Sequence, residues 1–343
     1  MPTHTNEDDI ASLRRWVFDG EIPEATLSRL LADPRLPEAI RTLAVNALEA
    51  SANDKALNGI CKDAGRYFTA MLVIYLHASG QLTLPNLKAY CATTKLLSPG
   101  RARALLSYLR YLKFIEQVPA ELGKGPARYT ATAALLTAWR SQLRAALQAA
   151  CTIEPAVRIV LDRLDDPEVF FTFIQIQTND MIAGVENDDA HREAPFMRII
   201  IHRHAGARIL LSLLAAAEFP PSEPIPLSIS ATAKRFGVSR IHVQRMLDEA
   251  QREGLLRRTD RGEIVFAESA KTYMRFFYPM QMIRLFSAAA KTIAARPDIV
   301  QPAAVHNPQP RAAGMSLARA IPEVGRSYAR RAEISSTIRP AGR

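Results

Sequence analysis

The chain of 343 residues is poor in cysteine. It has three, Cys61, Cys91 and Cys151, and no two of them have the CxxC spacing of a zinc or redox motif. A sparse and odd set of cysteines argues against a disulfide framework and is typical of a reducing compartment. We therefore expect a cytoplasmic protein without structural disulfides.

Long apolar runs and a secretory leader are also missing. The longest apolar run, Phe68 to Leu76, is interrupted by Thr69. It falls well short of the roughly 18 apolar residues that span a bilayer. The N-terminal sequence MPTHTNEDDI lacks the basic and then apolar pattern of a signal peptide. We expect no membrane partner.

Motifs for enzyme chemistry are absent as well. The nucleophile-elbow, zinc-protease, P-loop and dinucleotide-binding patterns do not occur in the sequence. Three histidines, His191, His202 and His204, lie near acidic residues and could supply metal ligands. However, His202 and His204 are two residues apart on a predicted helix and so point in different directions. The sequence thus predicts no enzyme, no metal site and no cofactor.

The chain is rich in positive charge, which is unevenly distributed. The formal net charge is +10. Segments 62–148 and 203–295 carry +9 and +6, the tail 296–343 carries +5, and segments 1–61 and 149–202 carry −4 and −6. Positive charge confined to particular modules is the footprint of a protein that binds a polyanion.

The sequence also repeats itself at a spacing of 141 residues. Ala64-Gly65 and Ala205-Gly206 each open an apolar run, and Ser98 and Ser239 each begin a segment with apolar residues at helical spacing. A fixed internal period indicates duplicated units. A weaker echo at a spacing of 133, Leu31-Ala32-Asp33-Pro34 against Leu164-Asp165-Asp166-Pro167, suggests that a helical arm is duplicated too.

The first unit shows three helices followed by a hairpin. We predict a helix over 66–78, a second that Thr83 caps and that ends near Thr93, a third that begins at Ser98 with Pro99 first, and strands at 114–118 and 127–130 around a turn at 123–125. The third helix places one apolar face inward, formed by Ala102, Leu105, Leu106, Leu109 and Leu112.

The second unit repeats this order. We expect Ser230 to cap a short helix and Ser239 to cap the next one, with Gly237 in the turn between them. Gly254 then ends the helix, a strand begins at Leu255, and Asp260-Arg261-Gly262 makes a tight turn. The inward face of the third helix is formed by Val243, Met246, Leu247 and Ala250.

These two segments, Thr83 to Ile115 and Ala233 to Arg258, resemble the winged helix of bacterial transcription regulators of the MarR and GntR kind. The resemblance covers roughly half of the chain and implies DNA binding, with base-reading residues on the third helix of each unit and phosphate contacts in the wings. The residues that it assigns to DNA are Ser98, Arg101, Arg103, Ser107, Lys124, Arg128, Ser239, Arg240, His242, Gln244, Arg245, Arg258 and Arg261. The tandem arrangement differs from those families and predicts a pseudo-dimer within one chain.

The expected fold is therefore mainly α, with two winged helix-turn-helix domains of three helices and a β-hairpin wing each. These are residues 62–148 and 203–295; an acidic helical segment (1–61) precedes them, an acidic helical connector (149–202) joins them and a disordered basic tail (296–343) follows.

The expected function is that of a sequence-specific regulator of transcription, bound to double-stranded DNA and associated with the bacterial nucleoid. Two alternatives stay open. One is a plasmid-type replication initiator, and the other is a winged-helix scaffold that binds RNA polymerase or a regulatory protein.

Overall fold

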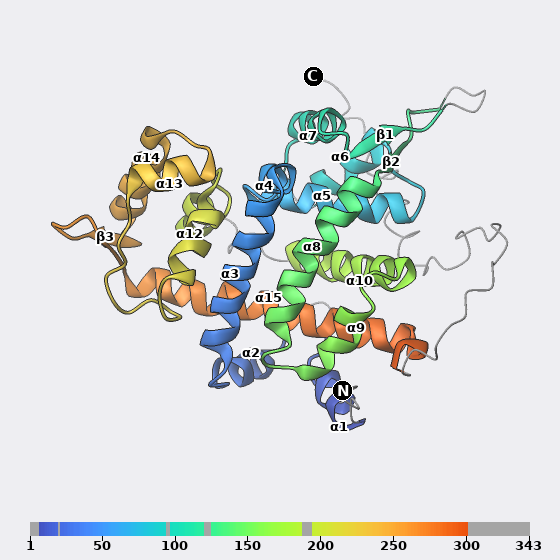
Figure 1. The fold of residues 1–343 in the computed structure, drawn as a ribbon, viewed down its shortest axis with the longest axis horizontal. Coiled ribbons are helices and arrows are strands. Elements are labelled where there is room, and N and C mark those ends of the chain that lie inside the picture. Colours follow the sequence, from blue (N-terminus) through green and yellow to red (C-terminus); the bar gives the residue numbers. More distant parts are fainter. Residues whose placement is uncertain (1–6, 20, 94–96, 120–124, 187–193, 301–343) are drawn as a thin grey trace, which may run out of the picture.

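The computed structural model describes residues 7–19, 21–93, 97–119, 125–186 and 194–300. The described part is mainly helical with two small antiparallel sheets, which confirms the predicted class (Figure 1). In chain order the elements are α1 (Glu7–Arg14), α2 (Glu24–Leu31), α3 (Leu36–Asn53), α4 (Lys55–Ile60), α5 (Ala64–Ala78), α6 (Leu84–Thr93), α7 (Pro99–Tyr111), β1 (Ile115–Gln117), β2 (Tyr129–Ala131), α8 (Ala133–Ala150), η1 (Pro155–Val157), α9 (Arg158–Asp162), α10 (Pro167–Glu186), η2 (Met197–Ile201), α12 (Gly206–Ala215), α13 (Ile229–Phe236), α14 (Arg240–Arg252), β3 (Leu256–Arg258), β4 (Ile264–Phe266), α15 (Glu268–Ala295) and η3 (Pro297–Val300).

The order of elements occurs twice. Three helices, two strands and a further helix make α5-α6-α7-β1-β2-α8, and the same order makes α12-α13-α14-β3-β4-α15. We call these the first and the second unit. In each, the two strands pair antiparallel and a residue ahead of the second helix forms a bridge to the hairpin, Thr83 with Arg128 and Ile225 with Ile264. The period seen in the sequence thus corresponds to a repeated order of structural elements.

Two serine caps fix where the third helix of each unit begins. The Ser98 hydroxyl accepts a hydrogen bond from the backbone N–H of Arg101 (3.3 Å). The Ser239 hydroxyl accepts one from that of His242 (3.0 Å). Each bond satisfies a backbone donor that would otherwise lack a partner in the first turn, a contribution of about 1 kcal/mol. Both predicted caps are confirmed.

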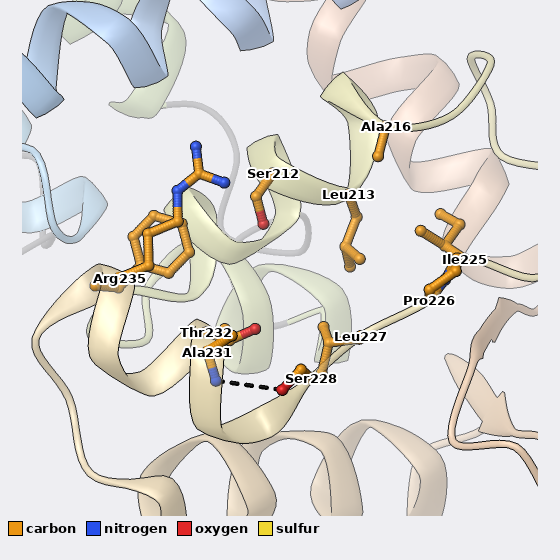
Figure 2. Close-up of a pocket in the computed structure, with 11 residues that line it drawn as sticks. Ser212, Leu213, Ala216, Ile225, Pro226, Leu227, Ser228, Ala231, Thr232 and Arg235 are labelled. Atoms are coloured by element: carbon orange, nitrogen blue, oxygen red, sulfur yellow. Dashed lines mark hydrogen bonds between the residues drawn. The ribbon is translucent and has the colours of Figure 1, made fainter.

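The predicted cap of α13 is wrong by two residues. Figure 2 shows that Ser228, rather than Ser230, accepts the hydrogen bond from the Ala231 backbone N–H (3.3 Å). The cause lies in the hairpin, because Ile225 exchanges two backbone hydrogen bonds of 2.8 Å with Ile264. This pairing holds the chain extended as far as the cap, and the helix begins directly after it.

Glycine is required at two of the predicted turns. Gly237 ends α13 with φ of +61°, and Gly262 lies in the β3–β4 turn with φ of +77°. Both values fall in the left-handed region, which residues other than glycine adopt only at a steric cost. The predicted turn between α13 and α14 is confirmed.

The helices of the acidic segments pack against both units. Helix α3 lies along α8 of the first unit and α12 of the second, and α10 lies along α15 of the second unit and α5 of the first (Figure 1). The pairing is reciprocal, since each helix contacts the last helix of the unit that follows it and the first helix of the other unit. Segments 1–61 and 149–202 therefore belong to the body of the fold and do more than join two domains.

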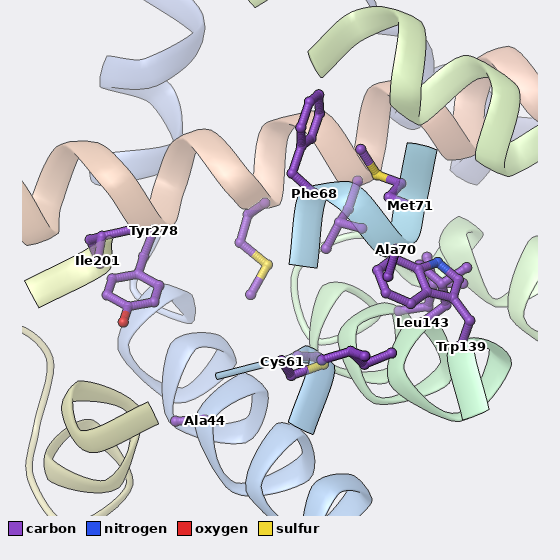
Figure 3. Packing of buried hydrophobic residues seen from close by; sticks show 14 of the residues in the cluster. Ala44, Cys61, Phe68, Ala70, Met71, Trp139, Leu143, Ile201 and Tyr278 are labelled. Atoms are coloured by element: carbon purple, nitrogen blue, oxygen red, sulfur yellow. The ribbon is translucent and has the colours of Figure 1, made fainter. Parts of the chain in front are cut away.

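One continuous hydrophobic core results. Figure 3 shows part of it, with Phe68 and Met71 of α5, Trp139 and Leu143 of α8, and Tyr278 of α15 farther along the cluster beside Ile201. A fully buried side chain of this size stabilises the fold by about 1.5 to 3 kcal/mol relative to an exposed one. Core residues of the two units and of both acidic segments belong to this single cluster.

The ordered part of the chain runs past the predicted start of the tail. Residues Pro297–Val300 form the short helix η3, in which Ile299 is buried. Arg296 pairs there with Asp298 (2.9 Å) and with Glu168 (2.7 Å) of α10. The remaining tail residues, 301–343, lie outside the described residues. Among the helices that the structure describes, none is both long and apolar enough to cross a membrane.

A shared core predicts that the two units unfold together. Phe173, fully buried in α10, should be a sensitive position, and Phe173→Ala is expected to lower the free energy of unfolding by about 3 to 5 kcal/mol. Urea unfolding followed by far-UV circular dichroism and by tryptophan fluorescence should give coincident single transitions for both proteins.

The control for this experiment is Tyr111→Ala, because the Tyr111 side chain is 82% exposed and its loss should change the free energy of unfolding by less than about 0.5 kcal/mol. Two separate transitions in the Phe173→Ala variant would show that the units have independent cores.

Candidate nucleic-acid interface

Helix α7 has the two faces that its sequence predicts. The inward face is buried, and Arg101, Arg103 and Ser107 on the opposite face are exposed. Tyr108 is only half-exposed, because its ring packs under the Arg66 guanidinium at 5.6 Å. Tyr111, at the end of the helix, is fully available to solvent.

Helix α14 is arranged in the same way. Its predicted inward residues are buried, and Arg240, Ile241 and Arg245 are exposed. His242 and Gln244 are half-buried at the edge of this face. Each unit thus presents arginines on the outer side of its third helix.

Several of the predicted DNA-binding residues already have partners. Asp248 accepts hydrogen bonds from the Gln244 amide (2.8 Å) and from Arg258 (2.6 Å), and Arg258 also contacts Gln251 (3.2 Å). Arg128 donates to the Gly80 carbonyl (3.1 Å). These bonds hold the side chains in place, and they must be exchanged if the same atoms are to contact DNA.

The other predicted residues fall into four groups. Ser98 and Ser239 use their hydroxyls as helix caps, and Lys124 lies outside the described residues. Arg101 and His242 take part in the junction described next. The exposed residues whose side chains make no hydrogen bond or ion pair with another described residue are Arg103, Ser107, Arg240, Arg245 and Arg261.

A buried carboxylate lies at the base of α7. The Asp63 side chain is 1% exposed, and Oδ1 caps α5 by accepting from the Arg66 backbone N–H (2.9 Å). Oδ1 also contacts the Arg101 guanidinium (3.2 Å), and Oδ2 lies 3.6 Å from Nδ1 of His204. Arginine next to a buried carboxylate offsets part of the free-energy cost of removing that charge from water.

The second unit meets the first at the same point. The Ala205 backbone N–H donates to the Lys62 carbonyl (2.8 Å), and His242 Nε2 donates to the His204 carbonyl (2.8 Å). We call Lys62, Asp63, His204 and Ala205 the junction. Through it, a continuous series of contacts runs from Arg101 near the start of α7 to His242 near the start of α14.

The junction sets the charge of its histidine. Burial lowers the pKa of His204 below its ordinary value, and the positive charges of Arg66 and Lys62 lower it further, against the opposing effect of Asp63. His204 is therefore a neutral imidazole at neutral pH. Burial also lowers the pKa of Lys62.

Sequence reasoning missed the junction, although one signal was there. Asp63 directly precedes the apolar run at Ala64-Gly65, and aspartate in that position is a preferred helix cap. His204 stands 141 residues later, at the repeat spacing. The contact between the two residues depends on tertiary packing and has no local signal.

Comparison with known protein families, with curated proteins and with solved structures finds no match to this chain. No group of three or more His, Cys, Asp or Glu that could hold a metal ion occurs among the described residues. His191, one of the histidines considered above, lies outside them.

The junction predicts a strong effect at one carboxylate. Asp63→Ala removes the α5 cap together with the anion beside Arg66 and Arg101, so the free energy of unfolding should fall by more than the roughly 1 kcal/mol of a lost cap. Asp63→Asn keeps an oxygen that can cap the helix and should cost less. Urea unfolding of both variants measures the difference.

A suitable control is Asp165→Asn, because Asp165 is 78% exposed and pairs with Arg144 at the surface. Its free energy of unfolding should change by less than about 0.5 kcal/mol. If Asp63→Ala behaved like this control, Asp63 would not hold the junction together.

Proposed function

We propose that the protein is a sequence-specific regulator of transcription that binds double-stranded DNA with both of its repeated units. The observation that carries the proposal is the pair α7 and α14, whose first turns both contact the junction and which present exposed arginines on their outer faces. Each unit would act as a winged helix-turn-helix, and the two together as a pseudo-dimer within one chain.

The element order supports this assignment. In helix-turn-helix proteins the second helix of the motif enters the major groove, and its N-terminal residues contact base edges. Arg103 in α7 and Arg240 and Arg245 in α14 lie in the first two turns and are exposed. Arginine can donate two hydrogen bonds to guanine in the major groove.

The charge distribution supports it as well. The repeated units carry +9 and +6, so each can neutralise several phosphates. Arg261, exposed in the β3–β4 turn, is placed at the tip of the second hairpin and would contact the backbone without reading bases.

Salt dependence provides the first test of DNA binding. Two units that each contact several phosphates release counterions, so the log–log slope of the association constant against salt should be on the order of −5 to −10. Fluorescence anisotropy with a labelled duplex over a salt series measures it. A slope near zero, or no binding at low salt, would contradict the proposal.

Base reading should divide between the two helices. Arg103→Ala should relax base preference in one half of the site, and Arg240→Ala with Arg245→Ala in the other, with each lost base-specific pair costing about 1 to 3 kcal/mol. Selection of duplexes from a random library identifies both preferences.

Two comparisons keep this test specific. Arg261→Ala should weaken binding to all sequences alike and reduce the salt slope by about 1. Arg144→Ala, at the surface pair with Asp165, should change neither preference nor affinity. If variants in α14 left the selected site unchanged, only the first unit would read DNA.

The shared core also predicts a fixed spacing between the half-sites. Flexibly tethered modules tolerate inserted base pairs, whereas units held by packing do not. Insertion of about half a helical turn, roughly 5 base pairs, between the selected half-sites should reduce affinity to that of one half-site alone. Unchanged affinity after the insertion would show that the units move independently on DNA.

The location of bound sites separates this proposal from the two alternatives. Genome-wide mapping should find sites at promoters. Sites confined to iterated repeats at a plasmid origin would identify a replication initiator, and a protein complex that survives nuclease treatment while DNA binding is absent would identify a scaffold.

A further inference from the structure

A cavity of about 320 Å³ lies between the two units. Its walls come from α5 and α8 of the first unit, from α12 and α15 of the second, and from α3 and α10. Figure 3 shows four of the lining residues, Cys61, Phe68, Ile201 and Tyr278. The volume lies at the lower end of the range of small-molecule sites, about 300 to 1,000 Å³.

Most of the wall is apolar or aromatic. Tyr67 and Phe68 line it from the first unit and Phe277 lines it from the second, together with Leu211. The Tyr67 ring packs on Trp139 with centroids 4.8 Å apart, which fixes its orientation. Apolar groups of a ligand would gain free energy by leaving water for such a surface.

One cation in the wall has no counter-ion. Arg208 is 4% exposed, and its Nη1 donates to the Ala47 carbonyl (3.1 Å). Its Nε has no hydrogen-bond partner, and no carboxylate of the described residues forms an ion pair with the guanidinium. An arginine stays charged in proteins, and a buried charge without a partner costs several kcal/mol.

The neighbouring groups do not supply the missing anion. Burial raises the pKa of the Cys61 thiol to about 12, so the thiol remains neutral. Asp63 also lines the cavity, but Arg66 and Arg101 already contact it. Burial lowers the pKa of Arg208, in keeping with a cation that lacks compensation.

Within the part of the chain that the structure describes, two amides in the wall also lack hydrogen-bond partners for their side-chain oxygens. Gln142 and Gln177 line the cavity, and in each the side-chain oxygen is buried without a hydrogen-bond partner among the described residues. Buried polar atoms are nearly always paired, so such atoms around one cavity point to a ligand that brings donors and acceptors with it.

We propose that this cavity binds a small monocarboxylate with an aromatic or aliphatic body. The carboxylate pairs with Arg208, whose planar guanidinium matches it with two parallel hydrogen bonds. The body of the ligand lies against Tyr67, Phe68 and Phe277. One ligand would thereby neutralise the buried cation and fill apolar space.

Such a ligand would contact both units at once. Occupancy favours the relative placement of α5 and α12 that fits the ligand best, and these helices begin at the junction that connects α7 with α14. A change in DNA affinity on binding follows by linkage. This last step rests on the proposed function, whereas binding itself does not.

Calorimetric titration of the full chain tests binding directly. The probes are 2-naphthoate and octanoate with their matched neutral carboxamides, each up to 1 mM. We expect each carboxylate to bind at least ten times more tightly than its amide. Arg208→Met keeps an apolar stem but removes the charge. In this variant the ratio of carboxylate affinity to amide affinity should fall to about one.

A matched control and a second readout keep the result clear. Arg252→Met removes an exposed arginine on α14 that does not line the cavity, and the ratio should stay unchanged. Trp139 fluorescence, isolated by Trp16→Phe, should change when a carboxylate binds, because Trp139 packs on Tyr67.

Three outcomes would overturn the site. These are no binding of either carboxylate at 1 mM, equal affinity for carboxylate and amide, and a preference that Arg208→Met retains. If Arg208→Met fails to fold, the ratio of carboxylate affinity to amide affinity in the unmodified chain tests the proposal instead. Ala146→Phe, which fills the cavity from α8, must then abolish binding.

DNA binding is measured separately, with a labelled random-sequence duplex at low salt. A chain that binds carboxylate but no DNA would leave the site intact and refute the proposed function. A chain that binds both independently would refute only the coupling between them.

Discussion

The packing of α3 and α10 across the two units is the constraint on which the rest of the structure depends. Each helix covers the last helix of one unit and the first helix of the other, so neither unit can bury its apolar faces without the partner. Apolar burial is the main favourable contribution to folding and has no direction of its own. The reciprocal pairing of α3 and α10 specifies how the helices are arranged, and it places α7 and α14 at fixed positions in one body.

That placement requires polar groups to be buried between the units, and the structure compensates them unequally. Asp63 lies beside Arg66 and Arg101, so two positive charges compensate its negative charge. Arg208 has a backbone carbonyl and no carboxylate among the described residues. A buried charge without a partner costs free energy, so the burial of Arg208 needs an explanation, whereas the burial of Asp63 does not.

Local signals predicted much of the fold and the exposed outer faces of α7 and α14. Ser98 and Ser239 were identifiable because a cap depends on residues only three positions away, and the faces of α7 and α14 follow from helical periodicity. Ser228 was missed because the Ile225–Ile264 bridge, a tertiary contact, decides where α13 begins. The role of Arg208 was missed for a similar reason, since only the packed helices show that no anion lies beside it.

A chain that holds two units of the same element order can place different residues at its centre, which a homodimer cannot do. Positions 141 residues apart meet across the middle of this molecule, where Asp63 faces His204 and where Tyr67 and Arg208 line one cavity. In a symmetric dimer each pair would consist of identical residues, and two buried aspartates or two buried arginines would repel each other. With both units in one sequence, the two positions of each pair can hold different residues. At the junction an acid faces an imidazole, and in the cavity an aromatic ring accompanies the buried Arg208.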